Sequence, residues 1–267
     1  MKKFGVLLVI ASTVFVWFWF NRFRIQEPIA IDVKVSPTQA PKKIKIAFMS
    51  DVHTETESLK KALMVAKEEM VDQVVLIGDL TNKGDEKSLY EIKKVMDDSG
   101  ISYASVPGNH EYSLDNYIKT FGNNYGTIEE DFLKLILIDN SYWGGFSEEQ
   151  IKWMEIEMSD CKKKICLAVM HKPINNLFSS HVMGEGSHKV AMEAEWLRQL
   201  MINSGIKRVM AGHLHYASSY ELEGIRTDLV GAISKERNTQ SARFTILEIS
   251  VDEIERKVVE INDDTGN

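Results

Sequence analysis

The chain has 267 residues, of which 44% are hydrophobic and 27% are charged, so a disordered polar chain is excluded and a large core can form. The formal net charge of -7 does not favour binding to a phosphate backbone, and we expect no nucleic-acid partner. The only two cysteines, Cys161 and Cys166, are too few for a disulfide framework. We interpret them as two unrelated thiols, although one short disulfide would suit a domain outside the cytoplasm.

An apolar segment opens the chain. Residues 4–20 read FGVLLVIASTVFVWFWF, without a charge, and would span roughly 25 Å as a helix, near the lower limit for crossing a bilayer. The bulky residues at its end do not resemble a signal-peptide cleavage site. We predict one transmembrane anchor over residues 1–21 and a stem broken by proline over residues 22–42. The remaining domain, residues 43–267, is expected outside the cytoplasm, although the basic flanks of the anchor nearly balance.

The body of the chain alternates between two sequence patterns, one typical of buried strands and one typical of amphipathic helices. Short apolar runs typical of buried strands cover residues 44–49, 74–77, 103–106, 132–138, 165–170 and 209–211. Amphipathic helical patterns cover residues 57–71, 86–98, 147–158 and 190–203. Two further stretches, residues 220–233 and 243–261, look like consecutive strands. This alternation predicts an α/β domain in which helices cover a mixed sheet.

Polar side chains follow five of the predicted strands, at the edge where α/β sheets bind ligands. These side chains are Asp51 and His53, Asp79, then Asn109, His110 and Glu111, then His171, and finally His213 and His215. Each motif alone is ordinary: an aspartate after a strand is most often a helix cap, and a lone histidine is most often a satisfied buried residue. Their conjunction is not ordinary, because five of the seven histidines in the chain lie in these motifs.

The chemistry of these residues indicates a metal site. Carboxylate, amide and imidazole groups without sulfur suit divalent manganese, iron, zinc or cobalt. Seven candidate ligands are too many for one tetrahedral ion, but they suit two ions that share a ligand and act together on a phosphoryl group.

The motif series DVH, GDLTNKG, GNHE, MHKP and GHLH resembles the calcineurin-like metallophosphoesterases over residues 44–217. The resemblance implies a four-layer αββα sandwich with mixed sheets. It also implies that two metal ions are bound, with Asp79 shared between them. One ion would be held by Asp51, His53 and His215, and the other by Asn109, His171 and His213. His110 would face the substrate and protonate the leaving group, and Glu111 would orient His110.

The resemblance further implies a reaction, in which a hydroxide bridging the two metals attacks the phosphorus of a phosphate monoester or diester. We expect a small-molecule or lipid-linked ester as the substrate. The alternative is a non-catalytic metal-binding interaction module of the same fold, which the complete ligand set disfavours.

Several residues besides the candidate ligands and the GNHE residues have more ordinary interpretations. We expect His181 and His188 on the surface, and Tyr142 and Trp143 in loop packing. Lys172 fits phosphate contact and a solvated position equally well. Asn82 faces the site or only shapes its turn.

Overall fold

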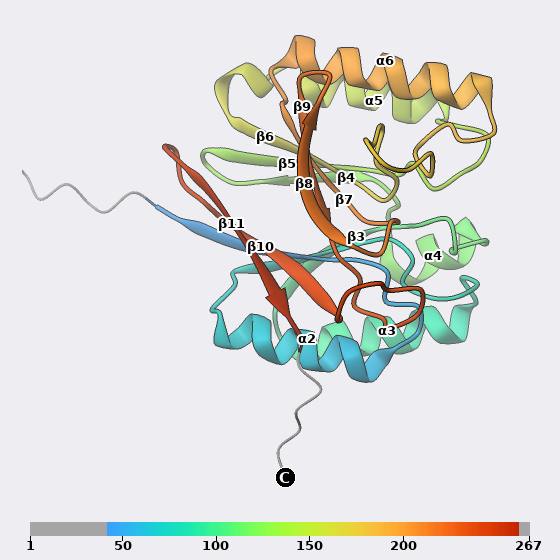
Figure 1. Cartoon of the computed structure of the whole chain (residues 1–267), viewed down its shortest axis with the longest axis vertical. Coiled ribbons are helices and arrows are strands. Elements are labelled where there is room, and N and C mark those ends of the chain that lie inside the picture. The colour runs from blue at the N-terminus through green and yellow to red at the C-terminus, as the bar shows by residue number, and fades with distance from the viewer. Residues whose placement is uncertain (1–41, 262–267) are drawn as a thin grey trace, which may run out of the picture. The chain divides into compact units, whose positions relative to one another are not determined.

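A computed structural model describes residues 42–261 of the chain (Figure 1). The predicted anchor, residues 1–21, and all but the last residue of the predicted stem lie outside the described residues. Among the helices of residues 42–261, none combines the length and the apolar character that crossing a membrane requires.

Two β-sheets form the centre of the domain. The first has the strand order β11-β10-β1-β2-β3, in which β1, β2 and β3 are parallel and β10 is antiparallel to both of its neighbours, β1 and β11. Its strands are β1 (Ile44–Met49), β2 (Gln73–Ile77), β3 (Ser102–Val106), β10 (Arg243–Ile249) and β11 (Ile254–Glu260). The second has the order β4-β5-β6-β7-β9-β8, in which β5, β6, β7 and β9 are parallel. Its strands are β4 (Gly126–Glu129), β5 (Leu133–Ile138), β6 (Ile165–Met170), β7 (Arg208–Ala211), β8 (Ala217–Leu222) and β9 (Ile225–Val230).

Helices cover the outer faces of both sheets, so the domain is a mixed α/β sandwich (Figure 1). The helices are α2 (Thr56–Glu68), α3 (Glu86–Ser99), α4 (Leu114–Phe121), α5 (Glu148–Met158) and α6 (His188–Ser204). Successive side chains of a strand point to opposite faces of its sheet. Each sheet can therefore pack against the other sheet with one face and against helices with the other. In β1, Phe48 lies in the apolar core between the sheets, whereas Met49 lies in the core shared with α2 and α3.

The helix ends follow from local sequence. Asp85 accepts a hydrogen bond from the Ser88 N–H at the start of α3, and Ser187 does the same for Val190 at the start of α6. Both helices end at a glycine in the left-handed conformation, Gly100 and Gly205.

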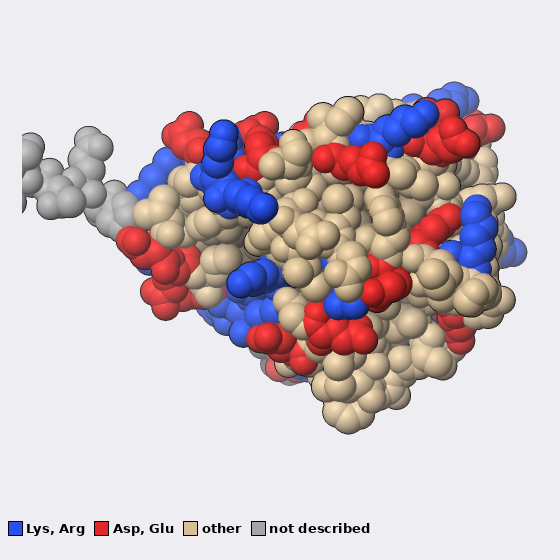
Figure 2. Space-filling model, turned by 90° about the horizontal axis from the view of Figure 1, so that it is seen from above, with Lys and Arg blue, Asp and Glu red and all other residues tan. Residues whose placement is uncertain are grey.

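On the face seen from the side of α5 and α6, acidic and basic side chains are interspersed around a central area without charged residues (Figure 2).

Two features differ from the sequence-based expectations. The interpretation of Cys161 and Cys166 as unrelated thiols is wrong, because they form a disulfide. The 3-10 turn Cys161–Lys163 brings their Cα atoms to 5.5 Å, within the usual range for a disulfide. The short elements α4 and β4 were not predicted. The helix α4 has eight residues with only Tyr117 buried, and β4 has four residues of which two are exposed, so both carry little apolar signal.

Candidate metal centre

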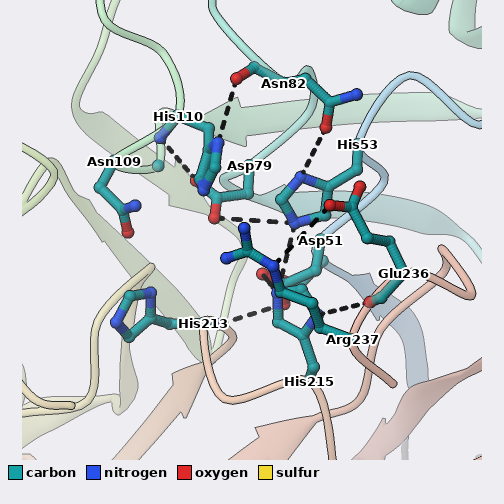
Figure 3. Close-up of polar contacts among 12 residues, drawn as sticks. Asp51, His53, Asp79, Asn82, Asn109, His110, His213, His215, Glu236 and Arg237 are labelled. Atoms are coloured by element: carbon teal, nitrogen blue, oxygen red, sulfur yellow. Dashed lines mark hydrogen bonds and ion pairs between the residues drawn. The ribbon is translucent and has the colours of Figure 1, made fainter.

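The loops after the parallel strands of both sheets converge on one site. Asp51 and His53 follow β1, Asp79 follows β2, Asn109 and His110 follow β3, His171 follows β6, and His213 and His215 follow β7. The loops are joined by backbone hydrogen bonds, among them His53 N–H to the Asp79 carbonyl at 3.0 Å and Gly212 N–H to the His171 carbonyl at 3.0 Å. The structure therefore brings all seven predicted ligands together. All of them except His171 are labelled in Figure 3.

Four of these residues form a first donor group. Ligand atoms of Asp51, His53, Asp79 and His215 all lie within 4.8 Å of one another. The Nε2 atom of His215 lies 3.2 Å from Asp51 Oδ1 and 3.2 Å from His53 Nε2.

A second donor group meets the first at Asp79. Ligand atoms of Asp79, His171 and His213 also lie within 4.8 Å of one another. The Nε2 atom of His171 is 3.2 Å from Asp79 Oδ2 and 3.2 Å from Asn109 Oδ1, so the amide of Asn109 belongs to this group. Asp79 is the residue common to both groups.

The donor atoms fit divalent metal ions. Two ligands bonded at about 2.1 Å to one ion lie roughly 3.0–3.5 Å apart. The four pairs at 3.2 Å described above have this separation, whereas His53 Nε2 and Asp79 Oδ2 are 3.9 Å apart. Each aspartate has one oxygen fixed by a backbone N–H: His213 N donates to Asp51 Oδ2 and His110 N donates to Asp79 Oδ1. The other oxygen of Asp51, Oδ1, is buried without a hydrogen-bond partner, a costly arrangement unless a cation binds there.

Oxygen acceptors around the site set which imidazole nitrogen faces the centre. The Nδ1 atoms of His53, His171 and His215 lie 2.9–3.1 Å from oxygens of Asn82, Ile77 and Glu236, respectively. These oxygens can only accept, so each Nδ1 carries the proton and each Nε2 lone pair is left for a metal.

Backbone strain is concentrated in the same loops. Nine residues other than glycine have positive φ in the described chain, and six of them lie here: Asp51, His53, Thr54, Asp79, His213 and His215. Such conformations persist only where the surroundings impose them, which is typical of functional sites. Packing is equally tight: a Cβ atom on Gly108 would lie 2.2 Å from Asp79 Oδ1, so only glycine allows this approach.

Comparison with known proteins identifies the family. The sequence profile of the calcineurin-like phosphoesterases matches residues 44–217. The chain belongs to the calcineurin-like phosphoesterase family. A probable cyclic nucleotide phosphodiesterase from Psychrobacter arcticus is 25% identical over 62% of this phosphoesterase and 64% of its own length. A probable glycerophosphodiester phosphodiesterase from Arcobacter nitrofigilis is 27% identical over 54% of this chain and 58% of its own length. The match thus spans less than two thirds of these relatives.

Solved structures share the fold. A dimetal phosphatase from Danio rerio superposes with a TM-score of 0.65 and covers 84% of this chain and 100% of its own. Its sequence identity is 15%, so the likeness concerns the fold alone.

Two residues of the GNHE motif have separate tasks in this phosphoesterase. The Nδ1 atom of His110 lies 3.0 Å from the Asn82 carbonyl oxygen, and its ring packs at 4.9 Å from the ring of His53. Among the described residues no hydrogen bond joins the Glu111 carboxylate to the His110 imidazole, and the expected role of Glu111 in orienting this ring stays a prediction. Its carboxylate accepts hydrogen bonds from the Thr81 N–H, the Thr81 hydroxyl and the Gly108 N–H at 2.8–3.1 Å. Glu111 therefore ties together the loops that carry Asp79 and Asn109.

Burial and charge perturb the titration of the metal-free centre. Burial, together with the nearby charge of His171, lowers the pKa of His213 to about 3. Burial opposes protonation of His171, but the Asp79 carboxylate prevails and raises the pKa of His171 to about 9. Burial and the charge of Asp79 raise the pKa of Glu111 to about 7. Without metal, the proton of the second donor group therefore resides on His171.

Sequence patterns did not point to Arg237, which the structure places beside the donor groups. It lies in the loop between β9 and β10, lines a cavity with His213 and His215, and has a positive φ of 55°. Its guanidinium extends over the donor groups in Figure 3, and its ion pair is a 3.8 Å contact with the neighbouring Glu236. No strand-end motif accompanies Arg237, so only the tertiary structure reveals its position.

Proposed function

We propose that this phosphoesterase hydrolyses phosphodiesters at a centre of two divalent metal ions that share Asp79. The observation that carries the proposal is the meeting of two donor groups at this one carboxylate. Asp51, His53 and His215 would complete the first ion, and Asn109, His171 and His213 the second. The nitrogen and oxygen donors suit manganese, iron, zinc or cobalt.

The bound ions would supply Lewis acidity for the phosphoryl oxygens and lower the pKa of a water nucleophile. The chain's own groups complete the site. With Nδ1–H of His110 donated to the Asn82 carbonyl, Nε2 is the atom left to face the substrate. In the imidazolium form of His110, the second proton on Nε2 can pass to the leaving alcohol, which leaves the neutral ring. The guanidinium of Arg237 has only a long ion pair of 3.8 Å with Glu236, so its N–H donors can bind a phosphoryl oxygen of the substrate. This contact would hold the ester in position for attack by the water nucleophile.

The names of the relatives support diesters over monoesters, since both similar proteins described above are named as probable phosphodiesterases. Hydrolysis of bis(4-nitrophenyl) phosphate and of 4-nitrophenyl phosphate with added Mn²⁺ tests this proposal. We expect the diester to be the better substrate, and the Asp79→Ala variant to lose both metal and turnover. Metal-loaded protein that hydrolyses neither ester would favour the alternative, a non-catalytic metal-binding interaction module.

We also propose that the chain is membrane-tethered with its catalytic domain outside the cytoplasm. The apolar run of residues 4–20 supports the tether, and the Cys161–Cys166 disulfide supports an oxidising compartment. Carbonate extraction of membranes and labelling of intact cells with a membrane-impermeant amine reagent test both parts. Release by carbonate would contradict the tether, and labelling only after permeabilisation would contradict the orientation.

A further inference from the structure

A cavity of about 380 Å³ adjoins the second donor group. His213, a proposed ligand, belongs to its wall, so a substrate at the metal centre has direct access to this cavity. The loop after β5, the loop after β6 and the start of α6 supply the rest of the lining. Its volume lies in the range of small-molecule sites.

Lys172 places an unpaired cation in this cavity. The residue is only 7% exposed, yet among the described residues its Nζ atom forms no ion pair with a carboxylate, and its contacts are with Ser141 and Trp143. Nζ donates to the Ser141 carbonyl at 3.1 Å and lies 4.4 Å from the centre of the Trp143 ring. Two of its three N–H donors therefore remain without an oxygen acceptor, an arrangement that favours an incoming anion.

The surroundings hold Lys172 in place. The side chain of Asn140 accepts from the Lys172 N–H at 3.0 Å and donates to the Lys172 carbonyl at 2.7 Å. The Ser141 N–H and hydroxyl both donate to Asp139 Oδ1, which fixes the carbonyl that receives Nζ. The cation is thus built into the turn and is not a mobile surface lysine.

The start of α6 adds a second source of positive potential. Ser187 and Val190 line the cavity, and the first turn of this helix carries no acidic side chain. The positive end of the helix dipole therefore faces the cavity. One carboxylate in the lining, Glu185, is paired with His181 at 2.9 Å.

The remaining lining includes aromatic and apolar side chains. Tyr142 and Trp143 are 68% and 65% exposed, although the sequence suggested loop packing for them, and Met183 also lines the cavity. Exposed aromatic rings beside a charged group suit a ligand with an apolar or aromatic body and one charged end.

We propose that this cavity binds the alcohol portion of the phosphoester and selects alcohols that carry a second negative charge, which Lys172 recognises. This inference rests on the proposed hydrolytic function. The alcohols that fit the cavity have a compact apolar or aromatic body that carries one anionic group. This group is either a carboxylate or a phosphoryl group.

Three aryl methyl phosphate diesters separate these cases: their rings carry a 4-carboxylate, a 4-phosphonate or the neutral methyl ester of the carboxylate. Release of the phenol gives kcat/KM for the wild type, for Lys172→Met and Lys172→Arg, and for Lys152→Met, which removes an exposed lysine on α5. We expect the wild type to prefer an anionic ester over the neutral one by about tenfold, as for a hydrogen bond to a charged group. Lys172→Met should abolish this ratio, mainly through KM, whereas Lys172→Arg and Lys152→Met should retain it.

The two charged esters show which anion the cavity prefers. A wild type that hydrolyses the neutral ester as well as both charged esters would overturn the cavity proposal and leave the hydrolase intact. The cavity proposal would also be overturned if Lys172→Met kept the wild-type ratio of kcat/KM for an anionic ester to kcat/KM for the neutral ester.

A binding measurement covers the case in which no ester is hydrolysed, which would instead count against the proposed function. In calorimetry with the Mn²⁺-loaded protein, 4-hydroxybenzoate should bind more tightly than its methyl ester, and Lys172→Met should remove the difference. Equal binding of the two phenols by the wild type would overturn the proposal.

Discussion

Replacing Glu111 by alanine should destabilise the domain and weaken the metal centre together. The carboxylate is nearly buried and accepts hydrogen bonds from two backbone N–H groups, of Thr81 and Gly108, and from the Thr81 hydroxyl. Each buried donor left without an acceptor costs about 1–3 kcal/mol, so the two N–H groups alone cost about 2–6 kcal/mol. Burial of the carboxyl is itself unfavourable, since it raises the pKa of Glu111 to about 7, and alanine avoids this cost. We therefore expect a net loss of about 2–4 kcal/mol in the free energy of unfolding. This is a large share of a typical domain stability of about 5–15 kcal/mol.

Urea unfolding of the metal-free protein measures this loss, and metal analysis of the folded variant measures the weakened centre. Glu111→Gln retains one oxygen acceptor and should lose about half as much free energy of unfolding. Thr81→Val removes the hydroxyl that donates to Glu111 and that also accepts from the Gly84 N–H at 2.7 Å. Adding it to Glu111→Ala should therefore lower the stability further, by the cost of one unsatisfied N–H of about 1–3 kcal/mol. If Glu111→Ala unfolds within about 0.5 kcal/mol of the wild type but loses turnover, the reasoning fails, and Glu111 acts on His110 in some other way.

Three further outcomes are expected. His110→Ala should keep its metal content while kcat falls by about 10²–10⁴-fold, the usual contribution of an acid catalyst, and an unchanged kcat would remove His110 from the mechanism. Arg237→Met should lower kcat/KM for diesters by about tenfold or more without changing metal content, and equal kinetics of the variant and the wild type would exclude a phosphoryl contact. Since the pKa of His171 is raised to about 9 without metal, its proton competes with the ion: Mn²⁺ affinity should rise by up to about tenfold per pH unit as the pH increases from about 6.5 to 9. Calorimetry that shows no proton release in this range would contradict the assignment of His171.

The sequence predicted the parts of the fold that depend on local pattern. The runs 44–49 and 165–170 coincide with β1 and β6, because buried parallel strands are short, apolar and bounded by turn residues. The candidate ligands could be named because each stands directly after such a strand, and the carboxyl ends of parallel strands face one edge. Loops following strands of two different sheets nevertheless meet at this site, and only the resemblance to the family implied that arrangement.

Contacts between distant segments could not be predicted. The spacing of Cys161 and Cys166 does not reveal the 3-10 turn that brings them together. The burial of Lys172 depends on the Asn140 side chain, 32 residues earlier in the chain. Arg237 reaches the centre through a loop whose path the Glu236 carbonyl fixes by its contact with His215. In each case the partner is set by tertiary packing, which no local pattern encodes.

Electron paramagnetic resonance of the Mn²⁺-loaded protein, together with metal analysis, tests most directly whether one carboxylate joins two ions. The account predicts two Mn²⁺ ions per chain with the spectrum of a magnetically coupled pair, since ions sharing a ligand lie about 3.5–4 Å apart. In Asp79→Ala the coupling should disappear. A single ion per chain, or two uncoupled ions in the wild type, would contradict the shared role of Asp79.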